Sequence, residues 1–166
     1  CLELNSLSKA HNMAGWRIGM VAADAEVISQ ILKVKSQMDS GMFKPLQLAA
    51  VKALEQGSGW FTELNDEYRR RRVLAGAIFD MLGVEYDHSS AGMFLWGKVP
   101  QDVQATEEIS IGQVLSDRIL YEAGVFITPG FIFGKNGEDY IRISLCAKPE
   151  TLREAAERIR QAGINR

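Results

Sequence analysis

Apolar and polar residues alternate in several short segments of the chain, as they do in β-strands. Leu2 to Leu4 alternates in this way, and Ile18 to Ala22 is a short apolar run, so both segments are predicted strands. The residues from Asn5 to Gly15 include Asn, Ser, Lys and Gly, which predicts a loop between the two strands. The strongest alternation is Tyr140 to Leu145, where Tyr, Arg and Ser alternate with Ile and Leu. That segment therefore predicts a strand with one polar and one apolar face.

Helical spacing of apolar residues marks five further segments. They begin after Asp24, at Pro45, at Trp60, at Ile109 and at Pro149. The longest runs from Trp60 to Leu82 and ends at Gly83. Beyond it, short predicted strands alternate with helices, and a glycine-rich loop precedes the Tyr140 strand. This change of pattern after Gly83 predicts a domain boundary followed by an α+β domain.

The amino-acid composition indicates the general class of protein but does not indicate which reaction or ligand it serves. The 166 residues are 46% hydrophobic and 24% charged, with a net charge of −2, as in a soluble globular protein. The near-neutral balance gives no reason to expect nucleic acid or a membrane as a partner. Two cysteines and two histidines fit neither a disulfide framework nor a zinc spacing, so we expect no metal and a cytoplasmic location.

The segment from Ser6 to Gly19 concentrates the candidate chemistry. It offers two hydroxyls, an amine and a guanidinium, on Ser6, Ser8, Lys9 and Arg17. Hydroxyls and a guanidinium donate hydrogen bonds to phosphate oxygens, and a lysine amine can condense with an aldehyde. Pyridoxal phosphate is an aldehyde that carries a phosphate. On these residues alone, a solvated lysine beside turn-forming serines stays an alternative.

The same segment closely resembles a known family signature. Ser-Leu-Ser-Lys followed by Asn-Met-Ala-Gly-Trp-Arg-Ile-Gly is similar to the cofactor-lysine motif of class I/II aminotransferases, which are pyridoxal-phosphate enzymes of fold type I. The resemblance implies that Lys9 forms the Schiff base with the cofactor and acts as the catalytic residue. It also implies that Ser6 and Arg17 bind the cofactor phosphate, with Ser8 as a weaker candidate.

A second segment resembles the C-terminal signature of the same family. Thr128-Pro129-Gly130, Phe133-Gly134 and Gly137 precede the strand Tyr140-Ile141-Arg142-Ile143-Ser144-Leu145. The resemblance implies that Arg142 grips the α-carboxylate of the substrate. A planar guanidinium suits a carboxylate, and a strand fixes its direction.

The resemblance also implies a fold class and a domain organisation. The chain resembles the C-terminal part of an α/β enzyme of fold type I. Residues 1–59 would be the incomplete end of the large cofactor domain, 60–82 the connecting helix and 83–166 the small α+β domain. The family's stacking aromatic, its carboxylate for the pyridine nitrogen and its glycine-rich phosphate turn have no counterpart here. We therefore expect a fragment, inactive alone, of an enzyme that is a homodimer.

The function implied is amino transfer between an amino acid and a 2-oxo acid. A lyase of the same fold, or an aminotransferase-like sensor domain of a transcription regulator, are the alternatives. The remaining motifs predict ordinary structural roles. The run Arg69 to Arg72 predicts a solvated helix face, and His11 a loop residue rather than a general base. Phe94 and Trp96 are predicted core residues, and Cys146 a buried thiol.

Overall fold

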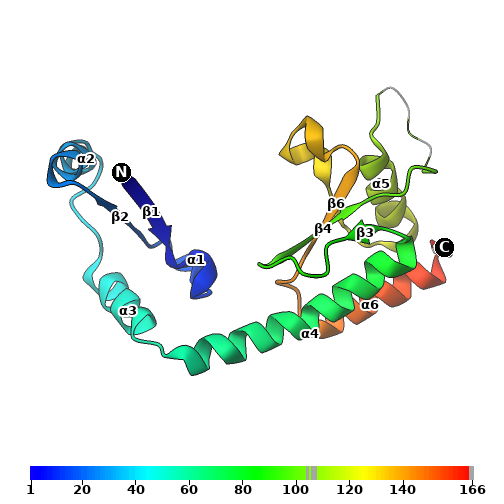
Figure 1. The fold of residues 1–166 in the computed structure, drawn as a ribbon, viewed down its shortest axis with the longest axis horizontal. Coiled ribbons are helices and arrows are strands. Elements are labelled where there is room, and N and C mark those ends of the chain that lie inside the picture. Colours follow the sequence, from blue (N-terminus) through cyan, green and yellow to red (C-terminus); the bar gives the residue numbers. More distant parts are fainter. Residues whose placement is uncertain (104, 106–107, 165–166) are drawn as a thin grey trace. The chain divides into compact units, whose positions relative to one another are not determined.

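The computed structural model describes residues 1–103, 105 and 108–164. They divide into two compact units, Cys1–Phe61 (unit 1) and Thr62–Arg166 (unit 2), both drawn in Figure 1. Among the described residues, no helix combines the length and the apolar character that a membrane crossing requires.

Unit 1 is built on a small antiparallel sheet. Its elements are β1 (Leu2–Ser6), α1 (Leu7–Ala10), the 3-10 helix η1 (Ala14–Trp16), β2 (Gly19–Ala23), α2 (Ala25–Met38), α3 (Lys44–Leu54) and the first turn of α4 (Ser58–Leu82). The predicted strands are present, but the segment predicted as a loop folds into α1 and η1. Pro45 stands in the first turn of α3, as its missing N–H allows.

The core of unit 1 is small. Its buried members are Leu7, Met13 and Ile18, which pack against the alanine-rich side of α3. Strand β1 is exposed along its whole length, and neither α2 nor α3 contains a buried residue. The turn that follows β1 is therefore the best-packed part of this unit.

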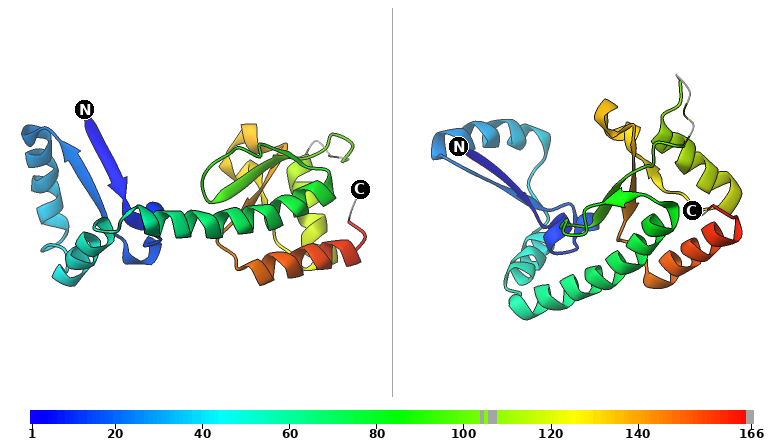
Figure 2. Two further views of the ribbon diagram at one scale, coloured as in Figure 1. Left: turned by 60° about the horizontal axis from the view of Figure 1, so that its bottom comes forward. Right: turned by 45° about the vertical axis from the view of Figure 1, so that its right-hand side comes forward.

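Unit 2 is a four-stranded antiparallel sheet packed against helices. Its elements after α4 are β3 (Glu85–Tyr86), β4 (Phe94–Lys98), α5 (Ile111–Ala123), β5 (Thr128–Pro129), the 3-10 helices η2 (Gly130–Phe133) and η3 (Lys135–Gly137), β6 (Tyr140–Ser144) and α6 (Pro149–Gln161). The strand order is β3-β4-β6-β5, so the two strands distant in sequence, β4 and β6, are central neighbours. Figure 2 shows two further views of these elements.

The register between β4 and β6 decides which side chains face the core. Leu95 pairs with Ile143, and both are buried with residues of α4, α5 and α6. Trp96 pairs with Arg142 on the other face. The prediction that Trp96 belongs to the core is therefore wrong, since the side chain is 37% exposed. Its position in the strand places it on the open face of the sheet.

Close backbone approach explains two glycines of the predicted loop. A Cβ atom on Gly130 would collide with the carbonyl oxygen of Gly137, and a Cβ on Gly137 would collide with that of Gly130. The loop from η2 to η3 therefore closes on itself only because both positions lack a side chain. This closure holds the loop at one end of β6.

Candidate functional site

The segment around Lys9 joins the two strands of unit 1 at one end of their sheet. Ser6, the last residue of β1, pairs with Gly19, the first residue of β2. The backbone N–H of Leu7 donates to the carbonyl oxygen of Ile18 at 3.3 Å. This pairing brings Ser6 and Arg17 to the same end of the sheet. The twelve residues between β1 and β2 therefore form a connection that begins and ends at neighbouring positions.

The two serines of the segment are in direct contact. The Ser6 hydroxyl donates to the Ser8 hydroxyl at 2.9 Å, and Ser6 Oγ accepts from the Ser8 backbone N–H at 3.1 Å. Ser6 thereby caps the short helix α1, which carries Lys9. Lys9 itself is exposed. These hydrogen bonds hold the two hydroxyls together at the start of the short helix that carries Lys9.

The backbone of the same segment is unusual at two residues. Asn12 has φ 55° and Arg17 has φ 51°, and among the described residues no other non-glycine has a positive φ. This conformation costs about 1–2 kcal/mol for a residue with a side chain such as Arg. The Arg17 guanidinium donates to the carbonyl oxygen of Ala14 at 2.9 Å. Strain of this sort is concentrated at functional sites, which makes the Arg17 turn a candidate.

His11 is more than a loop residue. Its ring stacks on Trp60, with centroids 5.8 Å apart, and meets the edge of Phe61 at 5.4 Å. Its Nδ1 is buried and has no hydrogen-bond partner among the described residues. The sequence prediction missed this packing role. The three rings attach the turn that carries Lys9 to the beginning of α4.

In unit 2, the guanidinium of Arg142 contacts two aromatic rings. Its carbon Cζ lies 4.3 Å from the centroid of Phe94 and 4.2 Å from that of Phe133. Phe94 comes from β4 and Phe133 from η2. Nε of Arg142 is buried and, within the described residues, has no hydrogen-bond partner. An unsatisfied donor on a planar, permanently charged group suits an anionic acceptor.

The sequence prediction assigned no role to either phenylalanine at this site. Phe94 was expected in the core, but it lies on the same face of the sheet as Arg142 because its partner in β6 is Ser144. The two-residue period of a strand would have placed Phe94 correctly once the register was known. Phe133 was noted only as part of the C-terminal signature, in Phe133-Gly134, and no role was assigned to its ring.

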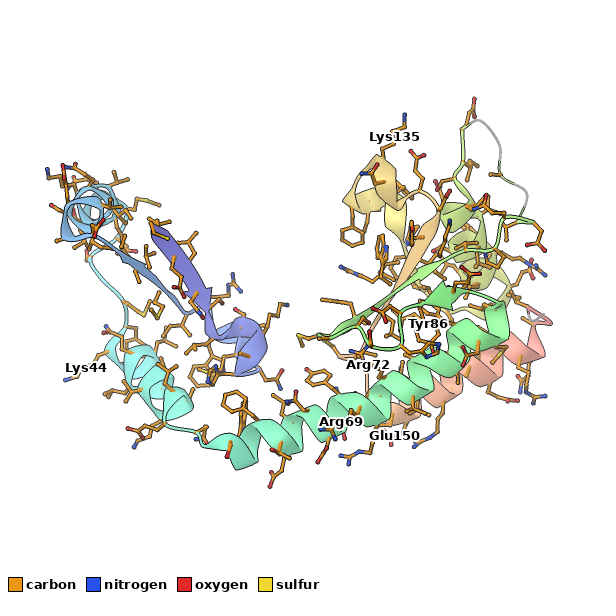
Figure 3. The ribbon with its side chains drawn as sticks, in the orientation of Figure 1. Lys44, Arg69, Arg72, Tyr86, Lys135 and Glu150 are labelled. Carbon is orange, nitrogen blue, oxygen red and sulfur yellow. The ribbon has the colours of Figure 1, made fainter. Side chains whose placement is uncertain are left out.

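Two of the four arginines in the run on α4 dock the helix instead of lying in solvent. Arg71 donates to the carbonyl oxygens of Leu145 at 3.1 Å and Cys146 at 3.4 Å. Arg72 donates to the Ser90 hydroxyl at 3.1 Å and to the carbonyl oxygen of Gly92 at 2.9 Å. The prediction of a solvated face holds for Arg69 and Arg70, which are exposed, and is wrong for the other two. Figure 3 labels Arg72 and Arg69 on different sides of α4.

Electrostatic pairing supports this docking. Glu67 accepts hydrogen bonds from Arg70 and Arg71, which lower the pKa of its carboxyl below the ordinary value. Arg71 is thus held by a carboxylate on its own helix while it binds the end of β6. Cys146 follows that end and is exposed, so the predicted buried thiol is wrong. The residue lies beyond the last pair of β4 and β6, which joins Phe94 to Ser144.

Ser6, Ser8, Lys9 and Arg17 all lie in one turn of unit 1, whereas Arg142 lies in unit 2. A cavity of about 720 Å³ in unit 1 touches Ser6 but neither Lys9 nor Arg17. A cavity of about 480 Å³ in unit 2 has Arg142 in its wall. Among the described residues, no three His, Cys, Asp or Glu side chains are grouped as metal ligands would be.

Comparisons with known proteins connect both segments to one family. A family model described as aminotransferase class I and II matches residues 1–159. The LL-diaminopimelate aminotransferase of Oleidesulfovibrio alaskensis is 40% identical over 158 residues, which are 95% of this chain and 39% of that protein. The corresponding protein of Aquifex aeolicus is 39% identical over 159 residues, again 39% of its length. The chain thus spans about two fifths of these curated relatives.

Solved structures give the same result. The aromatic aminotransferase from Pyrococcus horikoshii matches 98% of this chain with a TM-score of 0.82 and 31% identity, over 44% of its own length. The substrate-bound BacF structure from Bacillus subtilis matches 96% of this chain with a TM-score of 0.81 and 34% identity, over 39% of its own length. The similarity therefore includes both units.

Proposed function

This chain belongs to the class I and II aminotransferase family, and we propose that the full-length protein is a pyridoxal-phosphate-dependent aminotransferase. It would transfer an amino group between an amino acid and a 2-oxo acid. The observation that carries the proposal is the turn of unit 1, where two hydroxyls, Lys9 and a strained Arg17 are gathered at one end of a sheet. We also propose that residues 1–59 belong to the cofactor domain, 60–82 to a connecting helix and 83–166 to the small domain.

The donor set of this turn fits pyridoxal phosphate. Ser6 and Ser8 are already in contact, and together with Arg17 they would donate hydrogen bonds to the phosphate oxygens. Lys9 follows Ser8 directly and would hold the aldehyde end. When bound, the cofactor supplies an electron sink for the carbanion that forms at the substrate's α-carbon. The chain's own contribution is to hold the two ends of the cofactor at a fixed separation.

The remaining roles fall to two side chains. Lys9 would move the α-proton, since an amine close to that carbon can act as both general base and general acid. Arg142 would bind the α-carboxylate through its planar fork of donors, which includes the buried, unpartnered Nε. A carboxylate bound by this fork would have a fixed orientation, and such orientation of a substrate lowers the barrier for its reaction.

The relatives suggest where to look for the substrate. Several are named LL-diaminopimelate aminotransferases, and one solved structure is named an aromatic aminotransferase. The substrates in these names share an α-amino group and an α-carboxylate but differ in their side chains. We propose an α-amino acid as the donor, with LL-diaminopimelate the first to assay, and a role in amino-acid biosynthesis.

We propose a homodimer in the cytoplasm as the setting of the full-length enzyme. Unit 1 leaves Leu4, Met38 and Phe43 among others largely exposed, which supports a further protein surface against it. Cys1 and Cys146 are exposed and unpaired, as in a reducing compartment.

Reductive trapping tests the proposal. The full-length protein is mixed with pyridoxal phosphate and treated with borohydride, and the modified lysine is located by peptide mass spectrometry. We expect the adduct on Lys9, in large excess over exposed lysines such as Lys44. An adduct spread evenly over the lysines would contradict the cofactor assignment. Release of ammonia, instead of 2-oxo-acid-dependent turnover, would favour a lyase of the same fold.

A further inference from the structure

Two aromatic rings from different parts of unit 2 meet the same guanidinium. Phe94 lies in β4, while Phe133 ends the 3-10 helix η2, and the two ring centroids lie 4.3 Å and 4.2 Å from Cζ of Arg142. Both distances are within the range in which the negative face of a ring attracts a cation. We refer to Phe94 and Phe133 as the ring pair. The two residues are 39 positions apart in the sequence, so only the fold of the chain brings both rings to the same guanidinium.

Each member of the ring pair is held by contacts of its own. The segment before Phe94 is fixed by Arg72, which donates to the Gly92 carbonyl oxygen at 2.9 Å. Phe133 meets the edge of Trp96, with centroids 5.6 Å apart. Its loop, whose outer part is marked by Lys135 in Figure 3, closes through the contact between Gly130 and Gly137. The segment before Phe94 and the loop of Phe133 are therefore held by contacts that do not involve the Arg142 guanidinium.

The ring pair restricts Arg142 while leaving its charge unneutralised. In the described part of the chain Arg142 forms no ion pair, and its buried Nε has no acceptor. Rings satisfy none of the five N–H donors, which lie in the guanidinium plane. A carboxylate could accept from Nε and a neighbouring Nη in that plane, which would satisfy the donor that the protein leaves unpaired.

We propose that Phe94 and Phe133 are positioning residues that orient Arg142 before a substrate carboxylate arrives. The inference rests on the proposed function, because it takes the carboxylate to be that of the amino-acid substrate. A free arginine would lose side-chain freedom on binding, and the ring pair removes that loss in advance. Its effect therefore falls on binding of the substrate and not on the steps that follow.

The first measurement is a kinetic comparison of matched variants of the full-length protein. Phe133→Leu keeps an apolar side chain but removes the ring, Phe133→Tyr keeps the ring, and Phe131→Leu changes an aromatic residue of the same helix that is outside the ring pair. The amino donor is the one that the unmodified protein turns over fastest among LL-diaminopimelate and the standard L-amino acids. We expect Phe133→Leu and Phe94→Leu to raise KM for that donor by about 3- to 30-fold, with kcat within about threefold. The other two variants should stay within about twofold.

The second measurement does not depend on activity. Phenylglyoxal modifies accessible arginines, and mass spectrometry gives the rate at Arg142. We expect modification to be several-fold faster in Phe133→Leu and Phe94→Leu than in Phe133→Tyr and Phe131→Leu. Unchanged KM and unchanged modification in the leucine variants would overturn the role of the ring pair. If Arg142→Ala also left KM unchanged, the proposed function of Arg142 would fail, and with it the link to a carboxylate.

Discussion

In unit 2, Phe79, Leu95 and Ile159 are entirely buried, whereas the three buried apolar residues of unit 1 each keep 8% of their surface exposed. The difference extends to the helices. Helices α4, α5 and α6 all contribute buried side chains, while α2 and α3 contribute none. Unit 2 thus has a hydrophobic core of its own, and unit 1 leaves most of its large apolar side chains exposed.

The two candidate sites depend on these surroundings in different ways. Arg142 stands on a strand whose alternate residues, Ile141 and Ile143, are buried in the core of unit 2. The turn around Lys9 is held instead by local contacts, namely the Ser6 cap, a cluster of three buried apolar side chains and the two aromatic rings that contact His11. The comparison suggests that a core fixes the strand that carries Arg142 and that local contacts fix the turn that carries Lys9.

The largest effect is expected from the amine itself. Lys9→Ala in the full-length protein should abolish turnover, because in the proposed function the Lys9 amine both holds the cofactor and moves the α-proton. Lys44→Ala, at an exposed position of α3, is the matched control and should retain normal rates. The measurement is the steady-state rate with an amino donor and a 2-oxo acid. Near-normal turnover of Lys9→Ala would mean that this turn is not the reactive centre.

Deletion of core side chains tests the contrast between the units directly. Phe79→Ala should lower the free energy of unfolding of unit 2 by about 3–5 kcal/mol, because the side chain is wholly buried. Leu48→Ala in α3 should cost about 0.5 kcal/mol or less, since Leu48 is 55% exposed. Urea denaturation of this 166-residue chain, followed by circular dichroism, gives both values. Equal losses would show that unit 1 has a core comparable with that of unit 2.

A smaller effect is expected at Arg142, the proposed ligand of the substrate carboxylate. Arg142→Ala should lower kcat/KM by about 10- to 150-fold, the range for losing charge-assisted hydrogen bonds, and mainly through KM. Ile143 follows Arg142 but faces the core, so Ile143→Val should change stability slightly and leave KM unchanged. An unchanged kcat/KM in Arg142→Ala would exclude it as the carboxylate ligand.

The sequence predicted local structure better than contacts between distant segments. Helix α4 was expected from Trp60 to Leu82 and spans Ser58–Leu82, because helical spacing and the glycine at its end are local signals. The candidate site residues were found from the order of residues in two sequence motifs, and such motifs can be recognised without knowledge of the fold. Phe94 and Arg72 were misassigned because their partners lie in segments that only the folded sheet brings near. Their roles depend on register and docking, which composition and periodicity do not encode.

The smallest expected effect concerns the ion pairs that help to dock α4 in unit 2. Hydrogen bonds from Arg70 and Arg71 lower the pKa of Glu67 below its ordinary value of 4.5. A carboxyl group whose pKa is lower in the folded state contributes stability above its unfolded pKa, and this contribution is lost as the pH falls through the folded value. Glu67→Gln should therefore lower the thermal midpoint slightly at pH 7 and leave it unchanged at pH values well below 4.5.

Glu63→Gln, at a residue of α4 without an ion pair in the described part of the chain, should not show this pH dependence. Glu67→Gln could instead lower the midpoint equally at both pH values. That result would show that packing around Arg71, and not the charge of Glu67, stabilises this end of the sheet.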